Sequence, residues 1–310
     1  LPPPIAGLPP ITIPVNIVEE QSFDSDVHHT NGYLYSNVNL PYDLTLTIGG
    51  SGDFFDSDDS DSPDEDQFNP KFGITWNPLP GTTFRGAAFR TLKRTLITDQ
   101  TLEPTQVAGF NQFFDEPNGT DAWRFGGAID QIFTQRIYGG AEFTYRDMDV
   151  PFNDPAGDLQ NANWDEKILR TYLFWTPHKW LSLSAEYMYE DLHRDEDFAD
   201  GAKDVETHYL PLGLNFFHPS GLSASLKGTY VDQDGEFERA TNIRTFEDGD
   251  DNFWLFDAAI NYRLPKRYGF ISAGVKNLFD EDFEHFDTDR NNPRIQPDRT
   301  AFVSITLALP

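Results

Sequence analysis

The feature that most constrains this chain is a two-residue alternation of apolar and polar side chains that recurs from its first fifth to its last ten residues. Clear examples are YDLTLTIG (42–49), LSASLKGTY (222–230) and WLFDAAINY (254–262). Successive side chains of a β-strand point to opposite faces, so each stretch would present one apolar and one polar face. No stretch shows a convincing helical period. The sequence therefore predicts an all-β protein.

The predicted strands are joined by connections that alternate strictly between short and long. Short connections lie at 40–43, 77–82, 134–136, 176–179, 218–221 and 264–269, and long ones at 23–30, 51–67, 92–120, 148–164, 191–203, 235–250 and 277–298. Almost all the long connections are rich in Asp, Glu, Asn, Gly and Pro. Outer-membrane barrels have tight turns at the periplasmic side and long loops outside. We therefore expect a transmembrane antiparallel up-and-down β-barrel with short periplasmic turns and long acidic extracellular loops.

About 14 strands fit between these connections. They are expected at 11–22, 31–40, 43–53, 68–77, 82–91, 121–133, 137–147, 165–176, 179–190, 204–217, 222–234, 251–263, 267–276 and 299–308. Such lengths suit strands that cross a bilayer at a tilt and exceed the mean of about 5 to 6 residues in soluble proteins. Aromatic residues near the strand ends, such as Trp76, Trp123, Trp175 and Trp254, are typical of the girdles at membrane interfaces.

The composition excludes several classes of function. The formal net charge of −28, from 51 acidic and 23 basic residues, argues against nucleic-acid binding, because phosphate contacts need clustered Lys and Arg. The chain has no cysteine, so a disulfide framework and a thiolate metal site are excluded. Nothing resembles a nucleophile elbow, a phosphate-binding loop or an HExxH helix, so we expect no enzyme.

Two segments are expected. The start of the chain, LPPPIAGLPPITIP (1–14), lacks the basic and apolar regions of a signal peptide and is predicted to be a Pro-rich periplasmic linker. A frayed terminus is the alternative. Residues 15–310 would form the barrel. No apolar run approaches the roughly 18 to 20 residues that a transmembrane helix needs.

The charged residues on the polar faces of the predicted strands would point into the lumen if the opposite faces meet lipid. They are Lys71, Arg85, Arg124, Asp130, Glu142, Arg146, Arg170, Glu186, Glu190, Lys227, Asp257 and Arg263. A wall with charges of both signs suits a water-filled pore or a lumen packed by a loop. If the apolar face were instead an internal core, a second sheet would have to cover it.

The longest predicted loop, 92–120, carries Phe110, Phe113 and Phe114. We expect it to fold inward as a constriction or to form an outer binding surface, with an external flap as the alternative.

Two acidic stretches are candidates for binding Ca²⁺. DFFDSDDSDSPDEDQ (53–67) holds eight carboxylates, and hard cations need several oxygen ligands at once. A solvated acidic loop is the alternative. Asp287, Asp289 and Asn291 have the spacing of a calcium-binding loop, but the Gly at the sharp turn and the Glu at the twelfth position are missing. No other cofactor is expected.

GVKNLFDEDF (274–283), followed by a polar loop and RTAFVSITLAL (299–309), resembles the final hairpin of TonB-dependent outer-membrane receptors. FNPKFGITWNPLPGTTFRGAAFRTLKR (68–94) is similar to a hairpin of these receptors whose long outer loop here carries TLEPTQVAGFNQFFD (101–115). The receptors also have a plug domain, a TonB-contacting box and 22 strands, whereas this chain has room for neither segment before its strands. Its last residues are Leu307-Ala308-Leu309-Pro310, where such barrels often end in an aromatic residue. The resemblance implies either the C-terminal barrel portion of a receptor or a smaller, plugless barrel, which could follow periplasmic helical repeats.

We therefore expect a barrel in the outer membrane of a Gram-negative bacterium that moves a small solute. Its partners would be outer-membrane lipid, the solute, and a periplasmic domain or protein. Two alternatives remain: an export pore or a barrel that anchors periplasmic or surface partners, and a soluble, acidic, secreted carbohydrate-binding β-protein.

Overall fold

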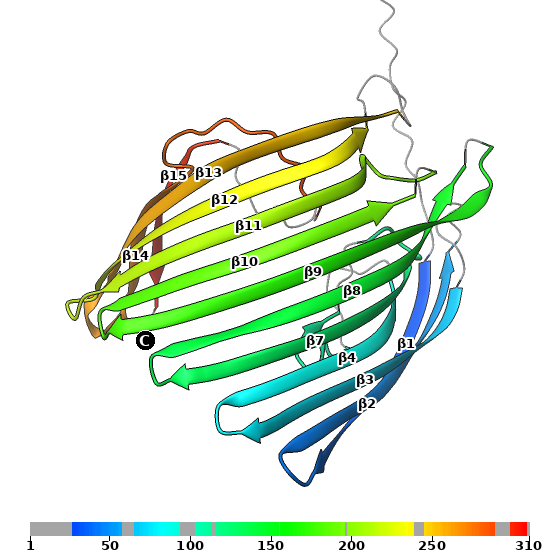
Figure 1. Ribbon diagram of the computed structural model, residues 1–310, viewed down its shortest axis with the longest axis horizontal. Helices are drawn as coiled ribbons and strands as arrows, with labels where there is room; N and C mark the ends of the chain where they lie inside the picture. The colour runs from blue at the N-terminus through cyan, green and yellow to red at the C-terminus, as the bar shows by residue number, and fades with distance from the viewer. Residues whose placement is uncertain are drawn as a thin grey trace, which may run out of the picture.

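The computed structural model describes residues 27–57, 65–93, 103–112, 116–154, 156–195, 197–238, 245–288 and 298–308. Thirteen strands form one sheet in which each strand pairs antiparallel with its neighbour in the chain, and the sheet is twisted and strongly curved (Figure 1). The strands are β1 (Val27–Leu40), β2 (Leu44–Ser57), β3 (Glu65–Leu79), β4 (Thr82–Leu92), β7 (Asp121–Thr134), β8 (Ile137–Asn153), β9 (Leu159–His178), β10 (Leu181–Arg194), β11 (Ala202–Phe217), β12 (Leu222–Glu238), β13 (Phe246–Arg263), β14 (Gly269–Lys276) and β15 (Thr300–Leu307).

Three short elements lie outside this sheet. β5 (Gln106–Val107) and β6 (Phe110–Asn111) form a small hairpin, and the 3-10 turn η2 (Pro265–Arg267) joins β13 to β14. Among the described residues, no helix is long and apolar enough to cross a membrane.

The prediction of an all-β, antiparallel, up-and-down fold is confirmed. Each strand of the large sheet corresponds to one predicted strand, while the predicted strand at 11–22 and the predicted linker at 1–14 lie outside the described residues. Tight turns lie at one end of the sheet and the longer connections at the other (Figure 1). Within the described residues β1 and β15 are the two edges, and the sheet is open between them.

Several strands extend further than predicted. β8 and β9 stay paired as far as Asn153 and Leu159, so most of the predicted loop 148–164 is a hairpin, and β12 and β13 fill much of 235–250. β1 begins at Val27 and takes up part of the predicted loop 23–30. At the outer ends of β12 and β13 both faces carry mostly polar side chains, so the alternation fades although backbone pairing continues. On β8 and β9 the alternation continues, but the apolar residues Val150, Ala162 and Trp164 lie on the same face as Arg146 and form a buried cluster. A pattern that keeps one face apolar along the whole strand therefore misses these strand ends.

The two faces of the sheet have opposite chemistry. On β3, Phe72 and Ile74 are 52% and 42% exposed, whereas Asn69 and Lys71 on the other face are each 1% exposed. We call these the apolar face and the polar face. The apolar face continues across the sheet with the exposed side chains Ile48, Phe125, Ile129, Phe143, Leu169, Leu173, Leu212, Leu226, Trp254 and Ile260. This burial pattern is the inverse of that of a soluble β-protein, in which apolar side chains are preferentially buried.

Candidate functional site

The predicted charged residues share one face of the sheet. Opposite residues of an antiparallel pair point to the same side, and the register places Glu142 opposite Arg170 and Lys227 opposite Asp257. Following the register from β3 to β13 puts every member of the predicted charged set on the polar face. Arg263 lies at the tight-turn end, near Ser220.

Arg85 forms the centre of one charged cluster. Its guanidinium donates to Asp130 at 2.8 Å and to Glu142 at 3.0 Å, so one cation bridges carboxylates from two neighbouring strands. The Tyr172 hydroxyl also donates to Asp130. Charge-assisted hydrogen bonds of this kind are stronger than neutral ones and fix the geometry of the side chains.

A second cluster lies towards the long-loop end of the sheet. Arg146 pairs with Glu166 at 3.1 Å and also with Glu116, while Arg124 lies 3.6 Å from Glu166. Glu166 was not among the predicted residues. It lies on β9 at an even-numbered position, like Arg170, and the period-two pattern would have placed it on the polar face.

The hairpin β5–β6 packs against the polar face of the sheet. Phe110 and Val107 are buried with Phe89 of β4, and the Arg85 guanidinium lies 5.1 Å from the centre of the Phe110 ring. Two glycines leave the space for this contact. A β-carbon at Gly126 would overlap the Phe110 ring, and one at Gly73 would lie 2.9 Å from the β-carbon of Ala108.

Polar contacts fasten the same hairpin. Lys71 and Glu103 form an ion pair at 3.6 Å, with both side chains almost completely buried. The Tyr35 hydroxyl donates to Glu103 at 2.6 Å, Lys71 donates to Gln112, and Arg124 donates to the carbonyl of Asn111 at 2.9 Å. Residues 103–112 are therefore held against the polar face of the sheet by several contacts, and we call them the inner hairpin. Phe113 and Phe114 lie outside the described residues.

The stretch NLFDED after β14 forms a tight, well-bonded turn. Asn277 has a positive φ of 47°, which Asn tolerates better than most residues, and is almost completely buried. Its side chain accepts from the N–H of Glu281 and donates to the carbonyl of Glu281, both at 2.9 Å, while its own N–H donates to Asp257 at 3.0 Å. These bonds turn the chain away from the sheet and back over the polar face.

The segment that follows, up to residue 288, packs on β10 to β13. Phe283 stacks on Phe253 with the ring centres 4.3 Å apart, and Tyr209 forms a 3.0 Å hydrogen bond with His285. Thr288 donates to Glu190, which places this predicted residue under the segment. The polar face is thus covered from two sides, by the inner hairpin and by residues 277–288.

The candidate calcium positions are mostly outside the described residues. Asp287 is described, whereas Asp289, Asn291 and the centre of the acidic stretch 53–67 are not. Among the residues that are described, no group of three or more His, Asp and Glu side chains could hold a metal ion. The calcium site stays a prediction.

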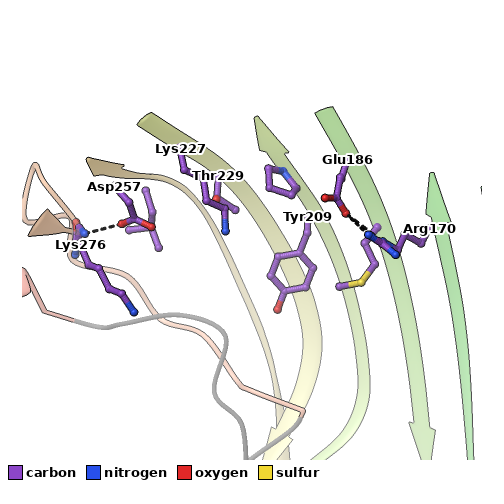
Figure 2. Close-up of a pocket in the computed structure, with 11 residues that line it drawn as sticks. Arg170, Glu186, Tyr209, Lys227, Thr229, Asp257 and Lys276 are labelled. Atoms are coloured by element: carbon purple, nitrogen blue, oxygen red, sulfur yellow. Dashed lines mark hydrogen bonds and ion pairs between the residues drawn. The ribbon is translucent and has the colours of Figure 1, made fainter. Parts of the chain in front are cut away.

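A pocket of about 250 Å³ lies on the polar face between β9 and the turn after β14 (Figure 2). Arg170 and Glu186, joined by a 2.7 Å ion pair, form one end, and Lys227, Asp257 and Lys276 form the other. The apolar part of the lining comes from Met188, Tyr209, Pro211 and Leu255. The pocket therefore combines several predicted charged residues with an apolar surface.

Comparison with known proteins identifies one family. A family profile described as "TonB dependent receptor-like, beta-barrel" matches residues 4–278. No curated protein matches the chain.

Solved structures with the same fold are transporters and receptors. The FrpB iron transporter from Neisseria meningitidis (F3-3 variant) matches with a TM-score of 0.67 and 13% identity, over 90% of this chain and 44% of FrpB. The outer membrane transporter YddB from Escherichia coli gives 0.62 and 13%, over 91% and 45%. FpvA from P. aeruginosa, solved bound to heterologous pyoverdines, gives 0.62 and 13%, over 90% and 38%. The chain thus spans less than half the length of each.

Proposed function

The chain belongs to the TonB-dependent receptor-like β-barrel family. From this we propose that it forms part of the wall of a β-barrel in the outer membrane of a Gram-negative bacterium, and that a small solute passes along its polar face. The apolar face would contact lipid, and the polar face would line the lumen. A periplasmic domain or protein is the further partner that such a barrel would use.

The inverted burial of the two faces carries this proposal. Removing a side chain such as Phe72 or Leu226 from water is worth about 1.5 to 3 kcal/mol, and the apolar face exposes many of them. Contact with lipid would remove these side chains from water without a second layer of protein. The alternative of a soluble carbohydrate-binding protein needs a covering sheet, and none covers Phe72 or Leu226 within the described residues.

The polar face supplies what a solute path needs. Arg85, Asp130 and Glu142 hold one another in place, so their charges create a fixed field that selects among solutes. The inner hairpin lies on the same face and would narrow the passage. Its contacts with Lys71 and Arg124 would keep it there during transport.

Reconstitution of the purified chain in a planar lipid bilayer tests this function. We expect stable current steps across a salt gradient and a larger conductance when residues 103–112 are replaced by a short Gly-Ser linker. Deletion of Ala156 and Gly157 from the β8–β9 turn is the matched control, because it shortens a connection at two exposed residues. A chain that stays soluble without detergent, or equal conductance in all three proteins, would contradict the proposal.

A further inference from the structure

The pocket of Figure 2 has a floor of short side chains between two charged ends. Pro211, Thr229 and Leu255 lie opposite one another on β11, β12 and β13, and in the next row Gly213, Lys227 and Asp257 do the same. Pro211 and Thr229 are short, and Gly213 has no side chain, so the sheet is hollowed here. A neighbouring hollow of about 500 Å³ shares Lys227, Asp257 and Lys276 with the pocket.

The carboxylates of the pocket already have partners. Glu186 accepts two hydrogen bonds from Arg170, at 2.7 and 3.1 Å, and Asp257 accepts the N–H of Asn277. Among the described residues, by contrast, Lys227 and Lys276 have no hydrogen-bond or ion-pair partner. The lining holds three cations and two carboxylates in a chain whose formal charge is −28. The pocket is therefore a local reversal of the overall charge.

The two lysines are placed to act together. Lys227 lies directly opposite Asp257, and Lys276 follows Val275, which pairs with Ala258, so the three residues form one row across β12, β13 and β14. Side chains directly opposite each other have β-carbons about 5 Å apart. Each ammonium group has three N–H donors and no acceptor. Lys227 and Lys276 lie on either side of Asp257, so their β-carbons are about 10 Å apart, two such steps across the sheet. Their long side chains can both reach an anion held between them.

The other side of the pocket suits an apolar group. Tyr209 and Leu255 are largely buried and pack with Val231 and Phe253, and Met188 packs against the same cluster. The hydrogen bond between Tyr209 and His285 fixes the tyrosine under the segment 277–288. An occupant would thus meet donors at one end and a preformed apolar wall at the other.

From this arrangement we propose that the pocket binds small organic anions that carry a carboxylate next to an apolar or aromatic group. The inference rests on the proposed function, because it assigns a solute class to the same polar face. A pocket of about 250 Å³ is slightly smaller than the usual range of about 300 to 1,000 Å³ for ligand sites, which points to a small molecule or to one group of a larger one.

Equilibrium binding to the full chain in a neutral detergent tests the proposal. Benzoate is the probe, with benzamide and benzylammonium as its neutral and cationic counterparts, and binding is followed by isothermal titration calorimetry. We expect benzoate to bind more tightly than benzamide and benzylammonium most weakly, with benzoate affinity falling as salt rises. Equal binding of benzoate and benzamide, or the absence of benzoate binding, would overturn the proposal.

Variants assign the binding to the two lysines. The double substitution Lys227→Gln and Lys276→Gln should lower benzoate affinity about tenfold or more, since it removes two charge-assisted contacts. Lys227→Arg with Lys276→Arg should keep most of the affinity, and Lys266→Gln in the η2 turn should leave it unchanged. Benzoate binding to the double Gln variant as tight as to the parent would refute the site.

Two controls keep the result interpretable. Heat-modifiable migration in gels reports whether each variant is folded. If the Gln variant does not fold, the preference of the parent chain for benzoate over benzamide and the salt dependence of that binding still test the proposal. Conductance in bilayers is measured separately. A chain that conducts without preferring benzoate contradicts the pocket alone, whereas binding without conductance contradicts the transport proposal alone.

Discussion

Gly126 on β7 leaves the space that the ring of Phe110 fills, because a β-carbon at this position would overlap that ring. Gly126→Ala should therefore displace the inner hairpin without breaking the strand, since Ala pairs in a sheet at least as well as Gly. We expect faster protease cleavage within 103–112 and a higher conductance in bilayers.

Gly127→Ala is the matched control for this prediction. Gly127 is the adjacent residue on the same strand, and a β-carbon there would meet nothing within 4 Å. The control should behave like the parent in both assays. Identical behaviour of the Gly126 and Gly127 variants would show that Phe110 does not hold the hairpin in place.

The buried pair of Lys71 and Glu103 should contribute to stability through charge compensation. Removing one partner of a buried ion pair costs about 3 to 5 kcal/mol, because the other charge stays buried. Glu103→Gln should therefore lower the free energy of unfolding by about that amount. Lys71→Met combined with Glu103→Leu should recover much of the loss, since neither position then holds an unpaired buried charge.

A double-mutant cycle of Lys71→Met and Glu103→Leu, followed by urea unfolding in detergent micelles, measures this coupling. Tryptophan fluorescence serves as the signal. A double variant whose loss equals the sum of the two single losses would mean that the pair has no net interaction.

Asn277 should be required for the turn that begins the second covering segment. Asn277→Ala removes both side-chain hydrogen bonds to Glu281. It also places an alanine at a φ of 47°, a conformation that Ala tolerates less well than Asn. We expect a loss of about 1 kcal/mol in unfolding free energy, because the backbone N–H and carbonyl of Glu281 lose their side-chain partner. Asn277→Asp, which keeps the acceptor for the Glu281 N–H, should lose less. Equal losses in the two variants would show that the side-chain bonds are not the cause.

Asp149 gives the chain a pH-dependent weakness at the long-loop end of β8, beyond Phe143 and outside the apolar band. Burial raises the pKa of Asp149 above 3.8, and the neighbouring charges of Asp121 and Asp147 raise this pKa further. Asp121 lies directly opposite Asp149 in the register. Ionised Asp149 is therefore less favourable in the folded chain than in the unfolded chain.

The sign of the effect follows from linkage. The destabilisation is absent below pH 3.8 and develops as the pH rises through the raised pKa of the folded chain. Asp149→Asn should raise the unfolding midpoint at pH 7 and lose this advantage at pH 3. Asp248→Asn controls for the change in net charge. An advantage for Asp149→Asn that persists unchanged at pH 3 would contradict the account.

The sequence contains the strands and their faces, but not the contacts of the loops. Lys71 and Arg85 are assigned to the polar face by alternation alone, because a period of two residues is a local property. Glu166 follows from the same rule once β9 is recognised. In contrast, the partnership of Glu103 with Lys71 and Tyr35 depends on where a long connection folds back, and no local pattern encodes that.

Two glycines also show that the sequence does not reveal which loop residues contact the sheet. The sequence contains Gly73 and Gly126 within predicted strands, where they weaken the strand unless something approaches closely. That Ala108 and Phe110 make this approach becomes visible only when the inner hairpin is placed. The ends of β8 and β9 were missed for a different reason. There the apolar residues Val150, Ala162 and Trp164 lie on the same face as Arg146, which reverses the arrangement along the rest of these strands.

The central claim is that the apolar face meets lipid while the polar face meets water. Because the chain has no cysteine, single cysteines at Leu226 and Ser225, adjacent on β12, can each carry one spin label. Accessibility to oxygen and to a water-soluble nickel complex is then measured in lipid vesicles. The account predicts that the label at 226 is accessible mainly to oxygen and the label at 225 mainly to the nickel complex. Equal accessibility of the two labels to both reagents would contradict it.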